Sequence, residues 1–177
     1  MKNNLPLSYS RCESFLVELF HDAIGFSYPD INLDKYLYEY NDFSGRIIVT
    51  GAGKAAASMV KSIEENTDII LSGAVVVPYG YKIESKYIEI LEASHPLPDK
   101  NSVYGAERIL ELCSSLTEND LHICLLSGGG SSLLCRPLNG VSLNEKQVIT
   151  NHLLNNGATI NELNTVRSHL SQIKGGK

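Results

Sequence analysis

Short, continuous apolar runs separated by helical patterns constrain the fold of this chain more than any other feature. Such runs, rich in Val and Ile, are typical of strands that are buried on both faces of a parallel sheet. Strands that alternate with helices predict a sheet covered by helices on both sides. The sequence therefore predicts a three-layer α/β domain with a mostly parallel sheet. The four predicted strands cover residues 47–49, 74–77, 88–91 and 122–126.

Five helices are expected from apolar residues that recur at helical spacing. Ser10 with Glu13, and Ser142 with Glu145, match the capping-box pattern in which two side chains satisfy backbone N–H groups at a helix start. The helix after residue 102 is expected to turn Leu110 inward, and the last helix to extend to Ile173. We expect one domain over residues 1–177, with an N-terminal helix and lead-in at 10–45 and an α/β core at 46–177. Residues 30–45 are expected to form a loop with a short extended piece.

Composition argues against several classes of function. The formal net charge is -5, and the 15 Lys and Arg residues are scattered, so neither nucleic acid nor an anionic membrane surface is an expected partner. No apolar run approaches the roughly 20 residues that span a bilayer, and the N-terminus lacks the plan of a secretory signal. The four cysteines show no C-x-x-C pairing and are expected to be small buried thiols. A cytoplasmic protein is expected.

The first glycine-rich turn, Gly51-Ala52-Gly53-Lys54, follows a strand and precedes a helix. Gly lacks a Cβ and lets the backbone approach a ligand, and a helix N-terminus favours negative charge. Lys54 adds a full positive charge, which predicts a phosphate or carboxylate site. Gly51-x-Gly53-x-x-Ala56 also fits a dinucleotide fingerprint, but the second strand ends without the acidic residue that would hold a ribose. A tight turn with a solvated lysine remains an alternative.

The second turn, Ser127-Gly128-Gly129-Gly130-Ser131-Ser132, follows the fourth strand. Successive backbone N–H groups in such a segment can form an anion-binding nest. A merely flexible loop is the alternative. His95 precedes Pro96, which holds its backbone extended, and either His95 or Asp99 could contact substrate or shape the loop.

Several motifs, in this order, resemble the type-2 glycerate kinases, which also carry the name hydroxypyruvate reductase. The shared motifs are Gly51-Ala52-Gly53-Lys54-Ala55-Ala56, Ala93-Ser94-His95-Pro96-x-Pro98-Asp99, Ser127-Gly128-Gly129-Gly130-Ser131, and a tail that includes Asn164-x-Val166-Arg167 and Lys174-Gly175-Gly176. The resemblance runs from about residue 10 to the end of the chain.

This resemblance implies a Rossmann-like N-terminal domain and transfer of the ATP γ-phosphoryl group to the 2-hydroxyl of D-glycerate, with Mg²⁺. It implies that Lys54 is catalytic and that residues 127–131 cradle an anionic ligand. Asn164 and Arg167 would lie near the cleft, where Arg167 could grip a carboxylate or phosphate. Gly51, Gly53 and His95 complete the expected binding residues, and no metal ligand is expected in this chain.

Family members continue past the Lys-Gly-Gly motif into a C-terminal domain, whereas this sequence stops at Lys177. We therefore expect the chain to supply only half of the cleft, completed by a separate C-terminal partner or a homo-oligomer. Two further hypotheses stay open. One is a non-catalytic module that binds nucleotide or glycerate, and the other is an NAD-dependent hydroxypyruvate reductase.

Overall fold

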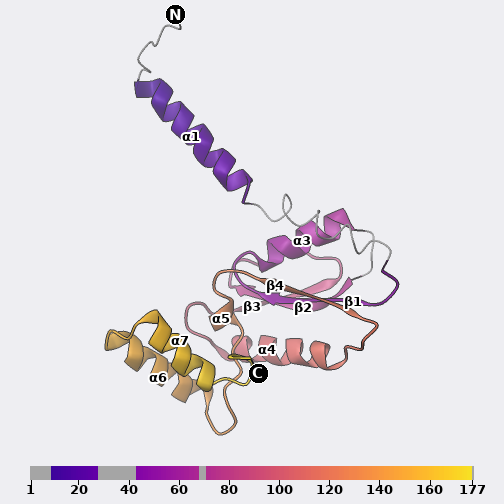
Figure 1. Cartoon of the computed structure of the whole chain (residues 1–177), viewed down its shortest axis with the longest axis vertical. Coiled ribbons are helices and arrows are strands. Elements are labelled where there is room, and N and C mark those ends of the chain that lie inside the picture. Colours follow the sequence, from indigo (N-terminus) through magenta and orange to yellow (C-terminus); the bar gives the residue numbers. More distant parts are fainter. Residues whose placement is uncertain (1–8, 28–42, 68–70, 177) are drawn as a thin grey trace, which may run out of the picture.

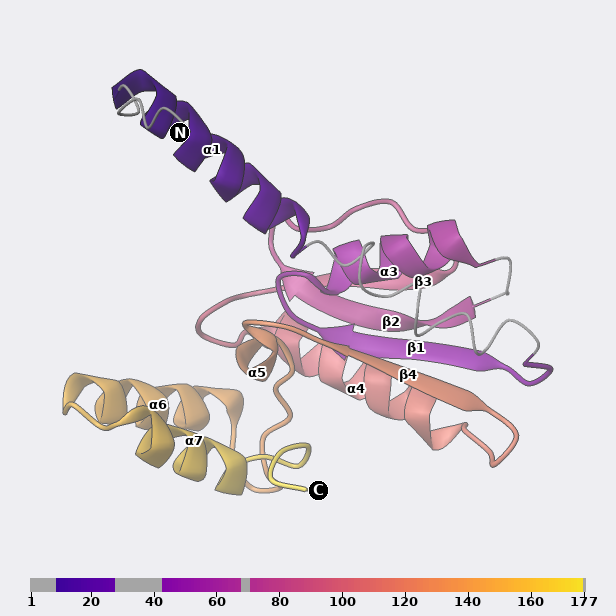
Figure 2. The ribbon, with the colours of Figure 1, turned by 45° about the horizontal axis from the view of Figure 1, so that its top comes forward.

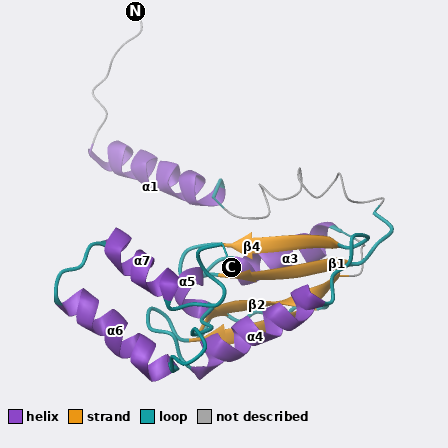
Figure 3. Ribbon diagram, turned by 60° about the horizontal axis from the view of Figure 1, so that its bottom comes forward, coloured by secondary structure: helices purple, strands orange, loops and turns teal. Residues whose placement is uncertain are grey.

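A four-stranded parallel sheet forms the centre of the molecule (Figures 1 and 3). The computed structural model describes residues 9–27, 43–67 and 71–176. The sheet order is β3-β2-β1-β4, and every neighbouring pair is parallel. Strand bounds are β1 Ile47–Ala52, β2 Leu71–Pro78, β3 Ile88–Ala93 and β4 Leu121–Leu126. All four predicted strands are present, and β2 begins before its predicted start.

Helices cover both faces of this sheet, which confirms the predicted α/β class. Helix α3 (Ala56–Asn66) lies on one face, and α4 (Lys100–Ser114) and the short α5 (Gly130–Leu133) lie on the other (Figure 2). Val49 and Val75 pack with Val60 and Ile63 of α3, while Val76 packs with Leu133 of α5. Full burial of each such side chain contributes about 1.5–3 kcal/mol. The two-sided core explains why β1 and β2 are apolar at successive positions.

The edge strand β4 departs from the prediction of a strand buried on both faces. His122, Cys124 and Leu126 are exposed, and Leu126 retains 65% of its accessible surface. Within the described chain β4 pairs only with β1, so its outward-facing residues lack the cover that β1 and β2 receive. An apolar run can therefore mark an edge strand as well as a central one.

The cysteines also differ from expectation. Only Cys135 is buried; Cys12 and Cys113 are half-buried and Cys124 is exposed, and all four are free thiols. Cys124 is exposed because it lies on the uncovered face of β4. Leu110 was expected to face inward from α4 but is 37% exposed, because it lies beside the buried face of that helix rather than on it.

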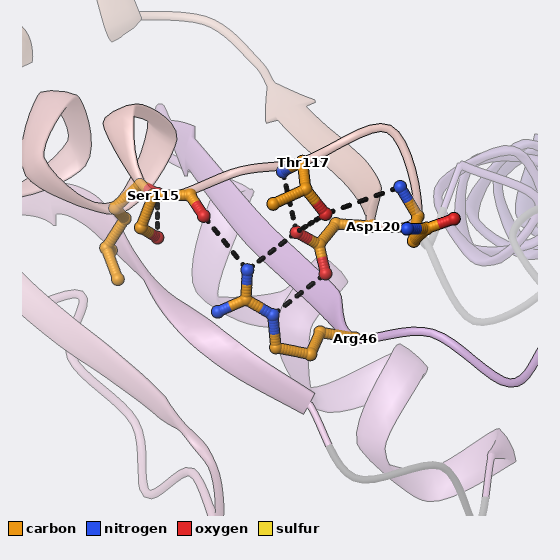
Figure 4. Close-up of polar contacts among 6 residues, drawn as sticks. Arg46, Ser115, Thr117 and Asp120 are labelled. Carbon is orange, nitrogen blue, oxygen red and sulfur yellow. Dashed lines mark hydrogen bonds and ion pairs between the residues drawn. The ribbon is translucent and has the colours of Figure 1, made fainter.

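An ion pair joins the amino ends of β1 and β4, at the end of the sheet opposite the glycine-rich turns (Figure 4). Arg46 Nε and Nη2 donate to the two carboxylate oxygens of Asp120 at 2.8 and 2.6 Å, and Nη2 also donates to the Ser115 carbonyl. The backbone N–H of Thr117 donates to the same carboxylate. Arg46 thereby ties the start of β1 to the loop that leads from α4 into β4.

The last two long helices form a hairpin beside the sheet, α6 (Leu143–Asn155) and α7 (Ile160–His169) (Figures 2 and 3). The predicted capping box of Ser142 and Glu145 is confirmed. Thr159 and Glu162 form another at the start of α7, which the sequence analysis did not identify. Helix α7 ends at His169, so Ile173 lies beyond it. Its C-terminal segment returns to the body of the domain, where Pro137 and Ser171 form an antiparallel bridge.

Helix α1 (Tyr9–Gly25) stands apart from the layered body (Figures 1 and 2). It ends at the predicted Gly25, while the side chain of Ser10 lies outside the described part of the chain, as does most of the predicted loop at 30–45. In the described segments no helix combines the length and the apolar character needed to cross a membrane.

Candidate functional site

The two glycine-rich turns meet at the carboxyl ends of β1 and β4, where ligands bind in open α/β sheets. The N–H of Lys54 donates to the Gly128 carbonyl at 2.9 Å, and the N–H of Ala55 donates to the Ser127 hydroxyl at 3.0 Å. In return the N–H of Ser127 donates to the Ala52 carbonyl. The turns therefore form one structural unit, although about seventy residues separate them in the sequence.

Two of the predicted glycines are required by close contacts within this unit. Gly53 has a φ of +140°, and a Cβ there would collide with the side chain and carbonyl of Ser127. Gly51 lies inside β1, and a Cβ there would collide with the Leu125 carbonyl of β4. The structure thus gives Gly51 a role in packing two strands, and Gly53 a role in joining the two turns.

The second turn supplies the hydrogen-bond donors that are free to meet a ligand. The amides of Lys54 and Ala55 are already bonded to the second turn. Within the described residues the N–H groups of Gly128, Gly129 and Ser131 have no hydrogen-bond acceptor. Gly129 has a left-handed φ of +94°, and a left-handed residue among successive N–H groups is the arrangement of an anion-binding nest. Lys54, which is exposed, follows the first turn at the same end of the sheet.

His95 reaches this nest from the loop that follows β3. Its ring lies so close to Gly129 that a Cβ there would come within 2.7 Å of His95 Cδ2. The His95-Pro96 bond is cis, and the imidazole is exposed to solvent. The structure therefore brings His95 together with the second glycine-rich turn.

Asp99 shapes the loop instead. Its carboxylate caps α4 by accepting from the Ser102 N–H at 2.9 Å, and it accepts from the Tyr79 hydroxyl at 2.6 Å. Burial alone would raise the pKa of Asp99, but these hydrogen bonds outweigh burial and lower it. Both oxygens of the Asp99 carboxylate thus accept hydrogen bonds from within the protein.

Asn164 and Arg167 lie on α7, and among the described residues no hydrogen bond or ion pair joins either side chain to the two turns. The side chain of Asn164 is exposed and has no hydrogen bond among the described residues, whereas Arg167 is half-buried beside Lys146, Lys174 and Cys135. The hairpin of α6 and α7 reaches the His95 loop through Gln147, whose Nε2 donates to the Pro98 carbonyl at 2.5 Å.

The sequence analysis missed Lys146, which is only 3% exposed. Lys146 and Thr150 lie four residues apart on the buried face of α6. Nothing in that spacing predicts burial from the sequence, because a lysine in a helix is normally a surface residue.

The described residues build no metal site of their own. They contain no group of three His, Cys, Asp or Glu side chains placed to hold one. The carboxylates near the turns have other partners, since Glu92 accepts from the Gly80 N–H and Asp99 caps α4. The residues present do not by themselves fit a magnesium site.

Several known proteins are similar to this chain over most of its length. The chain is 45% identical over 165 residues to the D-glycerate 2-kinase of Thermotoga maritima, covering 91% of this chain and 39% of that protein. It is 42% identical over 146 residues to the glycerate 2-kinase of Pyrococcus horikoshii, covering 81% of this chain and 33% of that protein. A relative from Agrobacterium vitis that is named a hydroxypyruvate reductase is 45% identical over 162 residues, covering 91% of this chain and 36% of that protein.

The crystal structure of glycerate kinase from Thermotoga maritima superposes with a TM-score of 0.85 at 43% identity, covering 94% of this chain and 40% of that one. The resemblance to glycerate 2-kinases is therefore confirmed in sequence and in fold, although the chain spans only between a third and two fifths of the length of these relatives. A family model matches residues 15–177. The chain thus belongs to the family described as a domain of unknown function (DUF4147).

Proposed function

We propose that this chain forms the nucleotide- and phosphate-handling part of a glycerate 2-kinase. The proposed reaction transfers the γ-phosphoryl group of ATP to the 2-hydroxyl of D-glycerate and yields 2-phosphoglycerate. The observation that carries the proposal is the joined pair of glycine-rich turns, which leaves the free N–H groups of residues 128, 129 and 131 near Lys54. Relatives named as glycerate 2-kinases support the substrate.

Phosphoryl transfer is mostly a matter of positioning and of stabilising charge. The glycerate hydroxyl oxygen forms a bond to the γ-phosphorus while the bond from that phosphorus to ADP breaks, and the hydroxyl proton passes to solvent water. In our proposal the nest at residues 127–131 binds one anionic group through its backbone N–H groups. Lys54 neutralises the charge that develops on the transferred group or holds the glycerate carboxylate. His95, against Gly129, contacts the ligand in the nest.

The rest of the cleft comes, in our proposal, from outside these residues: a C-terminal domain, a separate partner chain or a second copy. Mg²⁺, expected in such a kinase, would have its ligands there too, because the described residues form no metal site. We therefore assign no step of the reaction to the metal within this chain.

A reductase function has less support. A dinucleotide site of the Gly51–Ala56 type needs an acidic residue at the end of the next strand to hold the ribose. β2 ends at Pro78, and the following residues are Tyr79 and Gly80. Glu92, a carboxylate of β3, accepts a hydrogen bond from the Gly80 N–H and is thereby engaged by the turn after β2.

The test is an assay of the purified chain with ATP, Mg²⁺ and D-glycerate, in which the position of the product phosphate is determined. Lys54→Ala should lower turnover by about 10²–10³-fold, as loss of one charge-stabilising donor does elsewhere. Lys61→Ala is the matched control, because Lys61 is an exposed lysine on α3 that only reaches Glu65, at 3.7 Å.

If the chain alone shows no turnover, calorimetry with ATP and with glycerate distinguishes a half-site from an inactive remnant. Binding that is lost in Lys54→Ala supports a half-site that needs a partner. Turnover that survives Lys54→Ala, or NADH-dependent reduction of hydroxypyruvate without kinase activity, would refute the proposal.

A further inference from the structure

Three cationic side chains converge where the hairpin of α6 and α7 meets the end of α5. Lys146 comes from α6, Arg167 from α7, and Lys174 from the segment after α7. They surround the buried Cys135 and act on one another electrostatically. We call these three residues the cationic cluster. Lys146 is 3% exposed, while Arg167 and Lys174 are half-buried and so remain within reach of solvent.

Backbone carbonyls hold the two ammonium groups in place. Lys146 Nζ donates to the Leu170 carbonyl at 3.1 Å, and Lys174 Nζ donates to the Leu134 carbonyl at 2.6 Å. An ammonium group has three N–H donors and a guanidinium has five. The guanidinium of Arg167 makes no hydrogen bond within the described part of the chain, while Lys146 also contacts the Cys135 thiol. The donors of Arg167 and the remaining donors of Lys174 are therefore available.

The cluster also lacks a counter-charge. Among the described residues none of the three cations forms an ion pair with a carboxylate. The neighbouring Arg136, by contrast, forms an ion pair with Glu107, with 3.7 Å between Nη1 and Oε1. Buried charges in folded proteins are normally paired, so three unpaired cations in one place need an explanation.

Burial and mutual repulsion also shift the pKa values within the cluster. Burial, followed by repulsion from Lys146, lowers the pKa of Lys174 to about 8. Burial also lowers the pKa of Lys146 and of Arg167. Burial raises the pKa of the Cys135 thiol, which therefore stays neutral near pH 7 and does not balance the positive charge.

We propose that the cationic cluster is a binding site for a phosphate-class oxyanion. A guanidinium group can donate two parallel hydrogen bonds to two oxygens of a tetrahedral anion. Two ammonium groups can attract the remaining oxygens as compact positive charges. The resemblance already implied that Arg167 binds a carboxylate or phosphate, and the contacts described above add Lys146 and Lys174 to it. Lys54 and the glycine-rich turns take no part in it.

The test uses inorganic phosphate as the probe. We expect phosphate to raise the unfolding temperature of the native chain and of Lys54→Ala, as any ligand that binds only the folded state does. Lys174→Met keeps the length of the side chain but removes the charge, and it should lower phosphate affinity about tenfold, equivalent to ~1.4 kcal/mol. Lys61→Met, an equal loss of charge on exposed α3, should leave the affinity unchanged.

A bound anion favours the protonated form of Lys174, so binding near pH 8 should take up protons. Calorimetry in two buffers of different ionisation enthalpy measures this uptake on the native chain, without any variant. Chloride at equal ionic strength should not reproduce the stabilisation. The proposal is overturned if phosphate binds without proton uptake, if chloride stabilises equally, or if Lys54→Ala abolishes binding while Lys174→Met retains it.

Discussion

At the scale of single residues, Gly53 is the position where the backbone most clearly requires glycine. Its φ of +140° is strained for any other residue, and a Cβ would collide with Ser127. We predict that Gly53→Ala lowers the free energy of unfolding by about 1–3 kcal/mol, the range for a non-glycine residue held in such a conformation. Chemical denaturation, followed by circular dichroism, measures the change.

Gly128→Ala is the control, because Gly128 has an ordinary φ and open space around its Cβ position. Its stability should lie within about 0.5 kcal/mol of the native chain, as for surface substitutions away from special features. Equal stabilities for the two variants would show that the contact between the turns does not constrain Gly53.

Residue identities alone allowed the two turns to be recognised, but not the way in which they are joined. From the sequence we expected the backbone at Gly53 and the start of the next helix to approach a ligand. In the structure the amides of Lys54 and Ala55 bond to the second turn instead. That pairing depends on how β1 and β4 align, and no local pattern specifies the register between strands so far apart in the sequence.

At the scale of elements, the ion pair of Arg46 and Asp120 fastens the start of β1 to the start of β4. Hydrogen bonds from Arg46 and from the Thr117 N–H hold the pKa of Asp120 well below its ordinary value. A depressed carboxyl pKa contributes stability that is present above the unfolded-state pKa of about 3.9 and is lost as the pH falls towards the folded-state value.

We predict that Asp120→Asn lowers the unfolding temperature at pH 7, and that its deficit relative to the native chain shrinks as the pH falls below about 4. Thermal unfolding at intervals from pH 2 to pH 7 measures this convergence. Glu118→Gln is the control on the same loop, because Glu118 has no hydrogen bond or ion pair among the described residues, and it should follow the native curve. A deficit that stays constant with pH would contradict the prediction.

Strands and helices with a strong local sequence pattern were predicted well, whereas the neighbours that bury or expose them were not. β1 and β2 were recognisable because burial on both faces leaves a continuous apolar run. The run at 122–126 has the same appearance, yet β4 is an edge strand with three exposed residues. The same limit applies to Lys146, because only the packing of α6 against the segment around Leu170 buries it.

At the scale of the whole molecule, stability is distributed unevenly. β1 is buried along its whole length and β2 at every position except Ser72, and both are covered by helices on both faces. In α1, residues 13–24 are all exposed, among them Phe15, Leu16, Leu19 and Phe20 on one apolar face. In proteins most of a helix's stability comes from the tertiary packing of its apolar face, and the described residues leave that face of α1 exposed.

Hydrogen exchange followed by mass spectrometry should therefore show slow exchange in β1 and β2 and fast exchange across α1. Helix α4 is the internal comparison, because its length of 15 residues is close to the 17 residues of α1. Unlike α1, it has a buried side, which carries Ser102, Gly105 and Ala106. The free energy of local opening in folded proteins ranges from near zero for unpacked segments to the global free energy of unfolding for the core. Protection of α1 equal to that of α4 would contradict this order, and would mean that the apolar face of α1 is covered in solution. Dilution separates the two ways of covering it: protection that falls with protein concentration indicates a second copy, and protection that does not fall indicates packing within one chain.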